Sequence, residues 1–250
     1  MARVKTTKYR RAPITEAVME VRLRSNATDK QLSKVAGRLS SLYPRKEELH
    51  EKQFQIDTTG GNVSIAERSH GFRVASDDQA DIVILKPNAV TVARLAPYSD
   101  WESLSATAQD VWAIWRKANP ARAVERLGIR YINRIDVPFG DKPNLRLEDY
   151  VQFYPKIPEI GESQLLNYTM QVDMPTDKPM WRVRLTSAMV NPPPLLEHLS
   201  ILLDIDVYRD QDIPSKDELL WSTVEEARAV KNQIFEQCIT DKSRRLFSDE

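Results

Sequence analysis

Hydrophobic and polar positions alternate along residues 126–138, and this stretch organises the predicted fold. One side of the alternation carries Leu127, Ile129, Tyr131, Ile135 and Val137. The other side carries Arg126, Arg130, Arg134 and Asp136, with Gly128 and Ile132 among them. A period of two residues is typical of a strand with one buried face and one polar face. The pattern therefore predicts a strand whose exposed face presents a row of arginines.

The arginine row has two interpretations. Its members are spaced at i, i+4 and i+8, so they share one face of a sheet. Exposed charges often only solvate such a face, or pair with acids on a neighbouring strand. Guanidinium groups also bind anions well, because their planar fork of donors matches carboxylates and phosphates. The sequence leaves both interpretations open.

Further alternating stretches predict a sheet with many strands. The predicted strands cover residues 14–24, 53–57, 63–67, 71–76, 82–86, 89–95, 164–173, 180–189 and 199–208. Residues 45–52 are densely charged, and we expect a loop there. Apolar positions recurring at three and four residues predict helices over 30–42, 97–118 and 216–240, with a short helix over 147–154. Residues 243–250 are predicted to be a frayed tail.

The helix over 97–118 carries three tryptophans, Trp101, Trp112 and Trp115. A stripe of this kind can stack on a cofactor or a base, but its spacing favours burial in the core.

The order of these elements predicts an α+β fold. Residues 1–120 and 121–250 each show a strand, a helix, several strands and a long helix, and these two series of elements run over about 14–118 and 124–240. We expect duplicated β-α-β-β-β-α units that pack as one pseudo-symmetric domain. Their strands would form a largely antiparallel sheet, with the two long helices packed on one face. The other face is the predicted binding surface, and it comprises Glu16, Glu20, Arg22, Arg130, Asn133, Arg134, Arg182, Arg184, Asp204 and Asp206.

Some polar residues are not easily explained by packing alone. Glu16, Arg130, Asn133, Lys231 and Asn232 are the members of this group. They can form a buried polar network that joins the two halves.

Composition narrows the possible functions. Lys plus Arg and Asp plus Glu are 36 each, which gives a formal net charge of +0 and argues against binding to duplex nucleic acid. The single cysteine, Cys238, falls on the apolar side of the last predicted helix, and the 3 histidines show no metal-ligand spacing. We therefore expect no metal and no cofactor. The chain has no apolar run of the roughly 20 residues that span a membrane and no secretory signal at its start, which predicts a cytoplasmic protein.

Catalytic motifs are not evident. The 7 glycines form no phosphate-binding loop, and no nucleophile, metalloprotease, deaminase or kinase motif occurs. Glu16, Glu20, Arg22 and Arg24 resemble the charged first strand of tunnel-type triphosphate hydrolases, in which acids bind metal and bases bind phosphate. The spacing here is Glu-x-x-x-Glu-x-Arg, whereas that family has Glu-x-Glu-x-Lys. No residue is therefore predicted to be catalytic.

Four stretches resemble a sporadically distributed family of uncharacterised bacterial proteins of about this length. They are residues 9–22, 95–102, 126–134 and 231–240. They extend over nearly the whole chain, so the resemblance is to the full protein. It implies no activity, and the patchy distribution of the family is associated with mobile-element or defence gene clusters.

Three functions follow as hypotheses. The first is a non-catalytic binding or accessory protein that uses the polar sheet face or a sheet edge to hold a protein partner, or a small anionic ligand or nucleotide. The alternative is a metal-dependent hydrolase of a phosphorylated small molecule or nucleotide. The third is binding of RNA or single strands through the arginines. The oligomeric state is not predicted.

Overall fold

The computed structural model describes residues 8–56, 63–119, 123–140, 145–158 and 165–248. The chain forms two compact units. Unit 1 contains residues Met1–Ala17, Ala96–Tyr98 and Gly128–Glu250, and unit 2 contains Val18–Leu95 and Ser99–Leu127. The boundary therefore crosses the chain several times, and residues 8–17 belong with the C-terminal part.

One antiparallel sheet contains the nine strands found in the described residues. These strands are β1 (Ile14–Leu23), β2 (Arg45–Ile56), β3 (Val63–Ala75), β4 (Asp81–Lys86), β5 (Ala89–Leu95), β6 (Val124–Pro138), β7 (Thr169–Pro175), β8 (Arg182–Met189) and β9 (His198–Arg209). Their order in the sheet is β2-β3-β4-β5-β1-β6-β9-β8-β7. The α+β class and the antiparallel sheet predicted from the sequence are confirmed.

Unit 2 buries the tryptophan stripe. Helix α2 (Trp101–Ala118) packs against β5, and helix α1 (Asp29–Leu39) packs against α2 and β3. Both helices begin at a side-chain cap, a capping box at Thr28 and the carboxylate of Asp100. Trp101, Trp112 and Trp115 are all buried, so the core interpretation of this stripe is confirmed.

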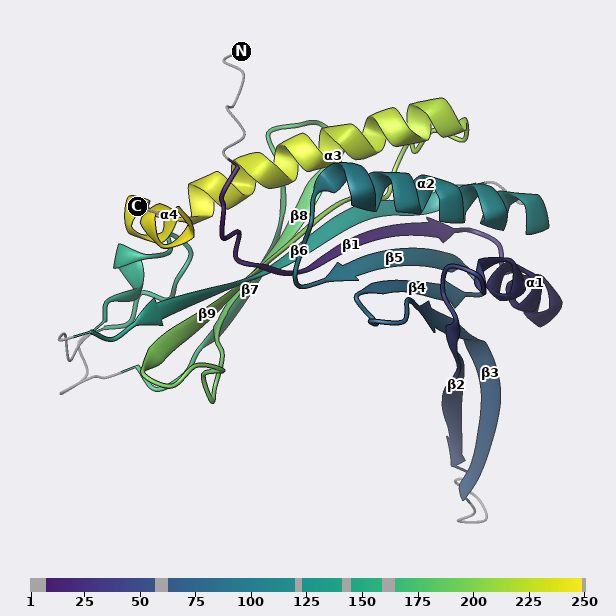
Figure 1. Ribbon diagram of the computed structural model, residues 1–250, viewed down its shortest axis with the longest axis horizontal. Coiled ribbons are helices and arrows are strands. Elements are labelled where there is room, and N and C mark those ends of the chain that lie inside the picture. Colours follow the sequence, from purple (N-terminus) through teal and green to yellow (C-terminus); the bar gives the residue numbers. More distant parts are fainter. Residues whose placement is uncertain (1–7, 57–62, 120–122, 141–144, 159–164, 249–250) are drawn as a thin grey trace. The chain divides into compact units, whose positions relative to one another are not determined.

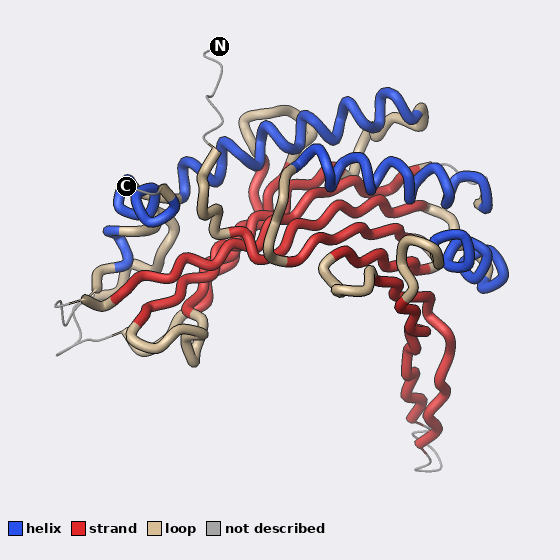
Figure 2. Tube along the Cα trace, in the orientation of Figure 1, coloured by secondary structure: helices blue, strands red, loops and turns tan. Residues whose placement is uncertain are grey.

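Unit 1 is built on β6 to β9 and the C-terminal helices. Helix α3 (Asp217–Cys238) packs against β9, and helix α4 (Asp241–Phe247) follows it (Figures 1 and 2). The predicted alternation holds on both central strands of this unit. Ile129, Tyr131, Ile135 and Val137 of β6 and Ile201, Leu203, Ile205 and Val207 of β9 are buried. The arginines between them on β6 face away from that core.

Several local predictions were wrong. Residues 45–52 are part of β2, which pairs along its length with β3, rather than a charged loop. The expected frayed tail includes helix α4, in which Ser243 and Phe247 are buried. The helix expected over 147–154 is only a 3-10 turn, Leu147–Asp149. The strand expected over 164–173 begins at Thr169, and residue 164 lies outside the described residues.

The duplication stays a prediction. In the described residues, one helix and four strands lie between β1 and α2, whereas three strands and only the 3-10 turn lie between β6 and α3. This order does not confirm an internal repeat. No helix among the described residues has the combination of length and apolar character that is needed to cross a lipid bilayer.

Candidate functional site

The arginines of unit 1 are paired with acidic side chains of the same unit. Strand β6 supplies Arg130 and Arg134, and β8 supplies Arg182 and Arg184. Their acidic partners come from β6 itself, from the neighbouring strands β9 and β7, and from the residue that follows β9. We call Arg130–Asp204, Arg134–Asp136 and Arg184–Asp173 the ion-pair ladder. The sequence left open whether these arginines pair with neighbouring acids or bind anions, and in the structure they are paired with acids.

Arg130 and Asp204 form the most closely bonded pair of the ladder. The guanidinium Nε donates to both carboxylate oxygens at 2.9 and 3.1 Å, and Nη2 donates to Oδ2 at 2.6 Å. The Asp204 side chain is 11% exposed, whereas that of Arg130 is 48% exposed. The hydrogen bonds from Arg130 to Asp204 raise the pKa of Arg130 above its usual value, and the negative charge of Glu16 adds to the effect. The arginine is thus fixed at one end and presents its other edge to solvent.

The second pair of the ladder is supported by a hydroxyl. Arg134 Nε donates to Asp136 Oδ2 at 3.0 Å. The hydroxyl of Ser200 on β9 donates to the other carboxylate oxygen of Asp136 at 2.6 Å. Ser200 itself is fully buried, so the serine holds the carboxylate in a fixed orientation.

Arg184 lies opposite an acid on each side. In the strand register it faces Asp173 on β7 and Asp206 on β9. Its Nε donates to both oxygens of Asp173 at 3.2 and 3.1 Å, and this bonding raises the pKa of Arg184. Both side chains are about half exposed, so we expect a small contribution to stability. Arg182 pairs with Asp210 at a longer 3.4 Å.

Two predicted site residues belong to unit 2. Glu20 accepts from Arg126 at 2.7 Å, and Arg22 lies 2.8 Å from the same carboxylate oxygen. Glu20 is therefore bound by two arginines of its own unit. It is not an open acid that is ready for a metal ion. The described residues contain no group of three or more His, Cys, Asp or Glu that could hold a metal.

The position of Asn133 corrects the predicted site. Its side chain is only 2% exposed and lies on the buried side of β6, opposite to Arg130 and Arg134. The amide nitrogen donates to the carbonyl oxygens of Leu203 at 3.0 Å and Tyr131 at 3.3 Å. Asn133 is two residues after Tyr131, so in a strand its side chain points to the same side as the buried Tyr131. Asn133 joins β6 to β9 from within the core and does not contribute to the exposed face.

A second group of polar residues, which the sequence did not bring together, surrounds Lys231 on α3. Its Nζ lies 3.8 Å from the centre of the Tyr131 ring on β6. The hydroxyl of Tyr131 is hydrogen bonded to that of Tyr98 at 3.0 Å, and the two rings meet edge to face. We call Lys231, Tyr131 and Tyr98 the lysine cluster. The sequence indicated that Lys231 and Asn133 were hard to explain by packing, but it gave no signal for the part played by Tyr98.

Burial strongly changes the acidity of Lys231. Its pKa is lowered from 10.5 to about 7, mainly by desolvation and also by the positive charge of Arg228, while Glu236 partly opposes the shift. The side chain nevertheless keeps some exposure to solvent. At neutral pH a large share of the amine is therefore unprotonated.

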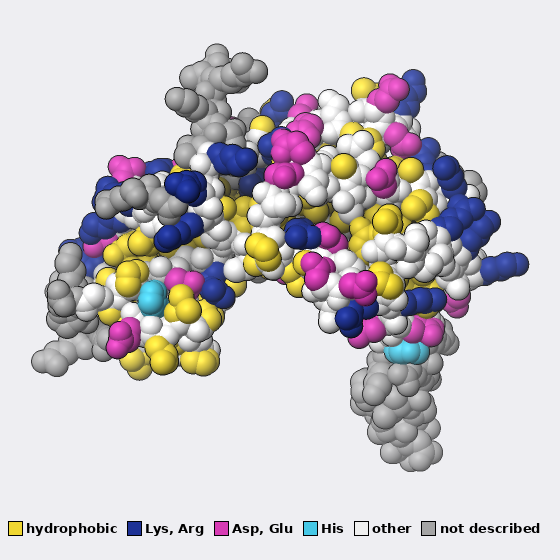
Figure 3. Space-filling view, viewed as in Figure 1, with side chains coloured by type: hydrophobic (Ala, Val, Ile, Leu, Met, Phe, Trp, Pro, Cys, Tyr) yellow, Lys and Arg dark blue, Asp and Glu magenta, His cyan; other side chains and the backbone are white. Residues whose placement is uncertain are grey.

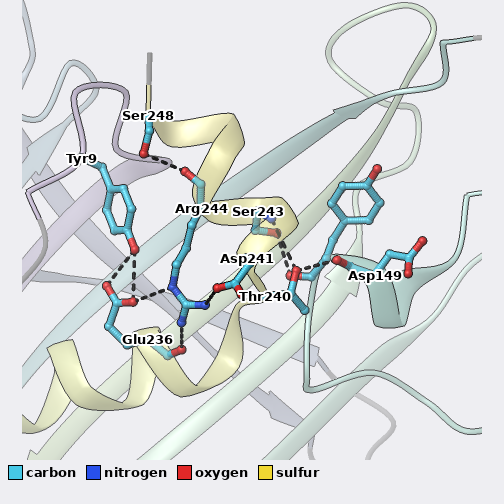
Figure 4. Close-up of polar contacts among 9 residues, drawn as sticks. Tyr9, Asp149, Glu236, Thr240, Asp241, Ser243, Arg244 and Ser248 are labelled. Carbon is cyan, nitrogen blue, oxygen red and sulfur yellow. Dashed lines mark hydrogen bonds and ion pairs between the residues drawn. The ribbon is translucent and has the colours of Figure 1, made fainter. Parts of the chain in front are cut away.

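The end of α3 is tied to the N-terminal segment (Figure 4). The hydroxyl of Tyr9 donates to the Glu236 carboxylate at 2.9 Å, and Arg244 of α4 donates to the same group at 3.0 Å. The Tyr9 ring also contacts those of Phe235 and Phe247 edge to face. Burial and the bond to Glu236 raise the pKa of Tyr9 to about 12. We call Tyr9, Glu236 and Arg244 the terminal clasp, and it fixes the part of α3 that follows Lys231.

Exposed hydrophobic side chains gather at the β8–β9 end of unit 1 (Figure 3). Phe139, Leu195 and Leu196 are 42%, 44% and 89% exposed. The backbone NH of Phe139 donates to the carbonyl of Glu197 at 2.9 Å, which holds the two segments together. Large apolar side chains grouped in solvent often mark an interaction surface.

Comparisons with known proteins do not define a class. The chain matches no protein-family model, and no curated protein matches it. Among solved structures, it aligns with the S. pombe RNA triphosphatase Pct1 over 96% of this chain and 86% of that chain, at 10% identity. The TM-score of this alignment is 0.14, so the likeness carries no argument about fold or activity.

Proposed function

We propose that this chain is a non-catalytic, cytoplasmic binding protein that uses the ion-pair ladder of unit 1 to hold a protein partner. The observation that carries the proposal is the pairing of the ladder arginines. Each is already neutralised by an acid of the same unit, while its side chain stays between 37% and 49% exposed. Such a surface offers donors and acceptors together, side by side.

A mixed surface of this kind suits a protein partner better than a polyanion. A phosphate-rich ligand would have to displace Asp204 from Arg130, and the freed carboxylates would then repel it. A protein surface can instead place its own acids and bases opposite the exposed edges of the ladder. The apolar group of Phe139, Leu195 and Leu196 in the same unit offers the kind of anchor that such interfaces use.

Charge reversal tests this proposal directly. Full-length protein is used as bait in its native extract, as wild type, as the double variant Arg134→Glu/Arg184→Glu, and as the matched control Lys30→Glu/Lys34→Glu on exposed positions of α1. We expect one protein to be retained in a constant ratio by the wild type and the control and to be lost by the ladder variant. Retention of the same proteins by all three baits contradicts the use of this face.

The same preparations test the alternative activity. Nucleotides and other phosphorylated small molecules are incubated with the wild type in Mg²⁺ or Mn²⁺, and released phosphate is measured. We expect no turnover. Hydrolysis that is abolished by Glu20→Ala or Arg130→Ala would replace the binding proposal with the metal-dependent hydrolase. A wider cradle that combines both halves, with Glu20 and Arg22 included, stays a prediction.

A further inference from the structure

Among the described residues, the amine of Lys231 lies beside an aromatic ring and not beside a carboxylate. Its Nζ lies over the face of the Tyr131 ring at 3.8 Å. Within the described part of the chain, no carboxylate forms an ion pair with Lys231 and no group accepts a hydrogen bond from it. The ring face attracts a protonated lysine, but it satisfies the three donors of the ammonium less well than water or a carboxylate would. Desolvation by burial outweighs this attraction and favours the neutral amine.

Of the charges near Lys231, Arg228 acts in the same direction and Glu236 opposes it only in part. Arg228 lies one turn earlier on α3 and repels the protonated form, while Glu236 lies beyond it on the same helix. Glu236 is already bound to Tyr9 of the N-terminal segment and to Arg244 of α4. Its charge is shared by these donors, so it compensates the lysine only weakly.

The phenol groups of Tyr131 and Tyr98 belong to the same cluster as Lys231. Tyr131 presents its ring face to the amine, and its hydroxyl is hydrogen bonded to the Tyr98 hydroxyl at 3.0 Å. Tyr98 comes from the segment before α2, Tyr131 from β6 and Lys231 from α3. A neutral amine beside a hydrogen-bonded pair of phenols combines a nucleophile with groups that can give and take a proton.

We propose that Lys231 is a reactive amine that binds small aldehydes or ketones reversibly as an imine. The amine lone pair attacks the carbonyl carbon, so that a C–N bond forms while the C=O π bond breaks. A proton moves from nitrogen to oxygen and gives a carbinolamine. The hydroxyl then leaves as water, with a proton supplied through the Tyr98–Tyr131 pair and the remaining N–H proton returned. The overall reaction converts amine and carbonyl compound to imine and water, without an oxidant or reductant. This site is independent of the proposed partner surface.

Reductive trapping on the full-length wild type tests the proposal. The protein is incubated with propanal and cyanoborohydride at pH 7, and peptide mass spectrometry follows the rate of labelling at each lysine. The exposed lysines Lys30 and Lys34 serve as internal controls. At pH 7 the neutral share of an ordinary lysine is about a thousand-fold smaller than that of an amine with a pKa near 7. Allowing for the weaker nucleophilicity of the less basic amine, we expect labelling of Lys231 at least about ten-fold faster than of either control.

Two further measurements separate reactivity from a structural contact. The labelling rate of Lys231 should rise with a midpoint near pH 7, whereas that of the controls should still be rising at pH 9. Tyr98→Phe, which keeps the ring but removes the hydroxyl, should slow labelling several-fold without changing this midpoint. Equal rates at Lys231, Lys30 and Lys34 would overturn the proposal and leave Lys231 as a purely structural cation beside Tyr131.

Discussion

At the residue scale, the polar face of unit 1 shows what exposed charge does in this chain. The sequence predicts that Arg130, Arg134 and Arg184 share one polar sheet face. In the structure, each of them is bound to its own acid. The pairs differ in how far they are buried, because Asp204 is far less exposed than Asp173. Burial therefore decides which pair contributes to stability.

Asp204→Ala should destabilise the protein by about 1–2 kcal/mol. The substitution leaves the guanidinium of Arg130 half buried without the carboxylate that accepts three of its hydrogen bonds. Asp173→Ala is the matched control and should cost less than about 1 kcal/mol, because its pair with Arg184 is well exposed. Urea unfolding followed by circular dichroism gives both values. A larger loss for Asp173→Ala than for Asp204→Ala would show that the ranking by burial is wrong.

Lys231 should make stability depend on pH in the alkaline range. The folded state holds its pKa at about 7, whereas its usual value is 10.5, so the unfolded chain binds the additional proton between these values. Below pH 7, burial of the protonated Lys231 lowers the free energy of unfolding by its full amount. This loss decreases as the pH rises from 7 toward 10.5.

Lys231→Met, which keeps much of the side-chain volume, should flatten this dependence. At pH 7 we expect a gain on the order of 1–3 kcal/mol, less than the full shift implies, because the lysine keeps some solvent exposure. The free energy of unfolding of both proteins, measured from pH 6.5 to 9.5, gives the result. Parallel curves for the wild type and the variant would exclude a strongly lowered pKa.

At the element scale, the sequence predicted the strands that have one buried face. β1, β6, β8 and β9 show a clear alternation, because a core lies on one side only and selects every second residue. The first part of β2, residues 45–52, was missed because Arg45-Lys-Glu-Glu carries charge on both sides, and its strand form follows from pairing with β3. Such pairing is a long-range contact, and local pattern does not encode it.

Helix α4 was missed for a related reason. Its sequence is short and charged, and the only large apolar side chains are Leu246 and Phe247. Phe247 is 4% exposed because it packs against the Tyr9 ring at 5.5 Å between ring centres, and Tyr9 is distant in sequence. The lysine cluster was also missed because it depends on contacts between residues distant in sequence. Its member Tyr98 comes from an irregular segment before α2.

Phe247→Ala should therefore cost about 2–4 kcal/mol, a value expected for a core aromatic and not for a tail. The loss of packing should also release the N-terminal segment, because Arg11 donates its backbone NH to the Phe247 carbonyl at 3.1 Å. Thermal unfolding and the rate of proteolysis at Arg10 and Arg11 measure both effects. Leu219→Ala on α3, where the side chain is 54% exposed, is the control and should change stability by less than about 0.5 kcal/mol. An equally small effect for Phe247→Ala would mean that α4 is not part of the core.

At the scale of the whole molecule, the two compact units are not two consecutive pieces of chain. Unit 2 is made of Val18–Leu95 and Ser99–Leu127, and the chain enters and leaves it within strands β1 and β6. The sequence predicted halves of 1–120 and 121–250 from element order, and their pseudo-symmetry stays a prediction. Element order could not show that residues 8–17 belong with the C-terminal part, because that depends on contacts such as the bond from Thr15 to the Ile132 carbonyl.

A fragment of residues 121–250 should not fold cooperatively by itself. It lacks Tyr9 of the terminal clasp, the Thr15 hydroxyl that bonds to β6, and Tyr98 of the lysine cluster. We expect weak near-ultraviolet circular dichroism and no sharp thermal transition for this fragment. Co-expression with residues 1–120 should restore both signals. A sharp transition in the isolated fragment would show that the C-terminal half is an autonomous domain.

The terminal clasp also has a consequence for the synthesis of the chain. Tyr9 and its acceptor Glu236 are separated by 227 positions, so Tyr9 leaves the ribosome long before its partner is made. Folding during translation usually begins with the residues made first, but here Tyr9 must wait for Glu236 and Arg244. Until Glu236 and Arg244 have been made, the N-terminal segment lacks these partners and is open to chaperones and proteases.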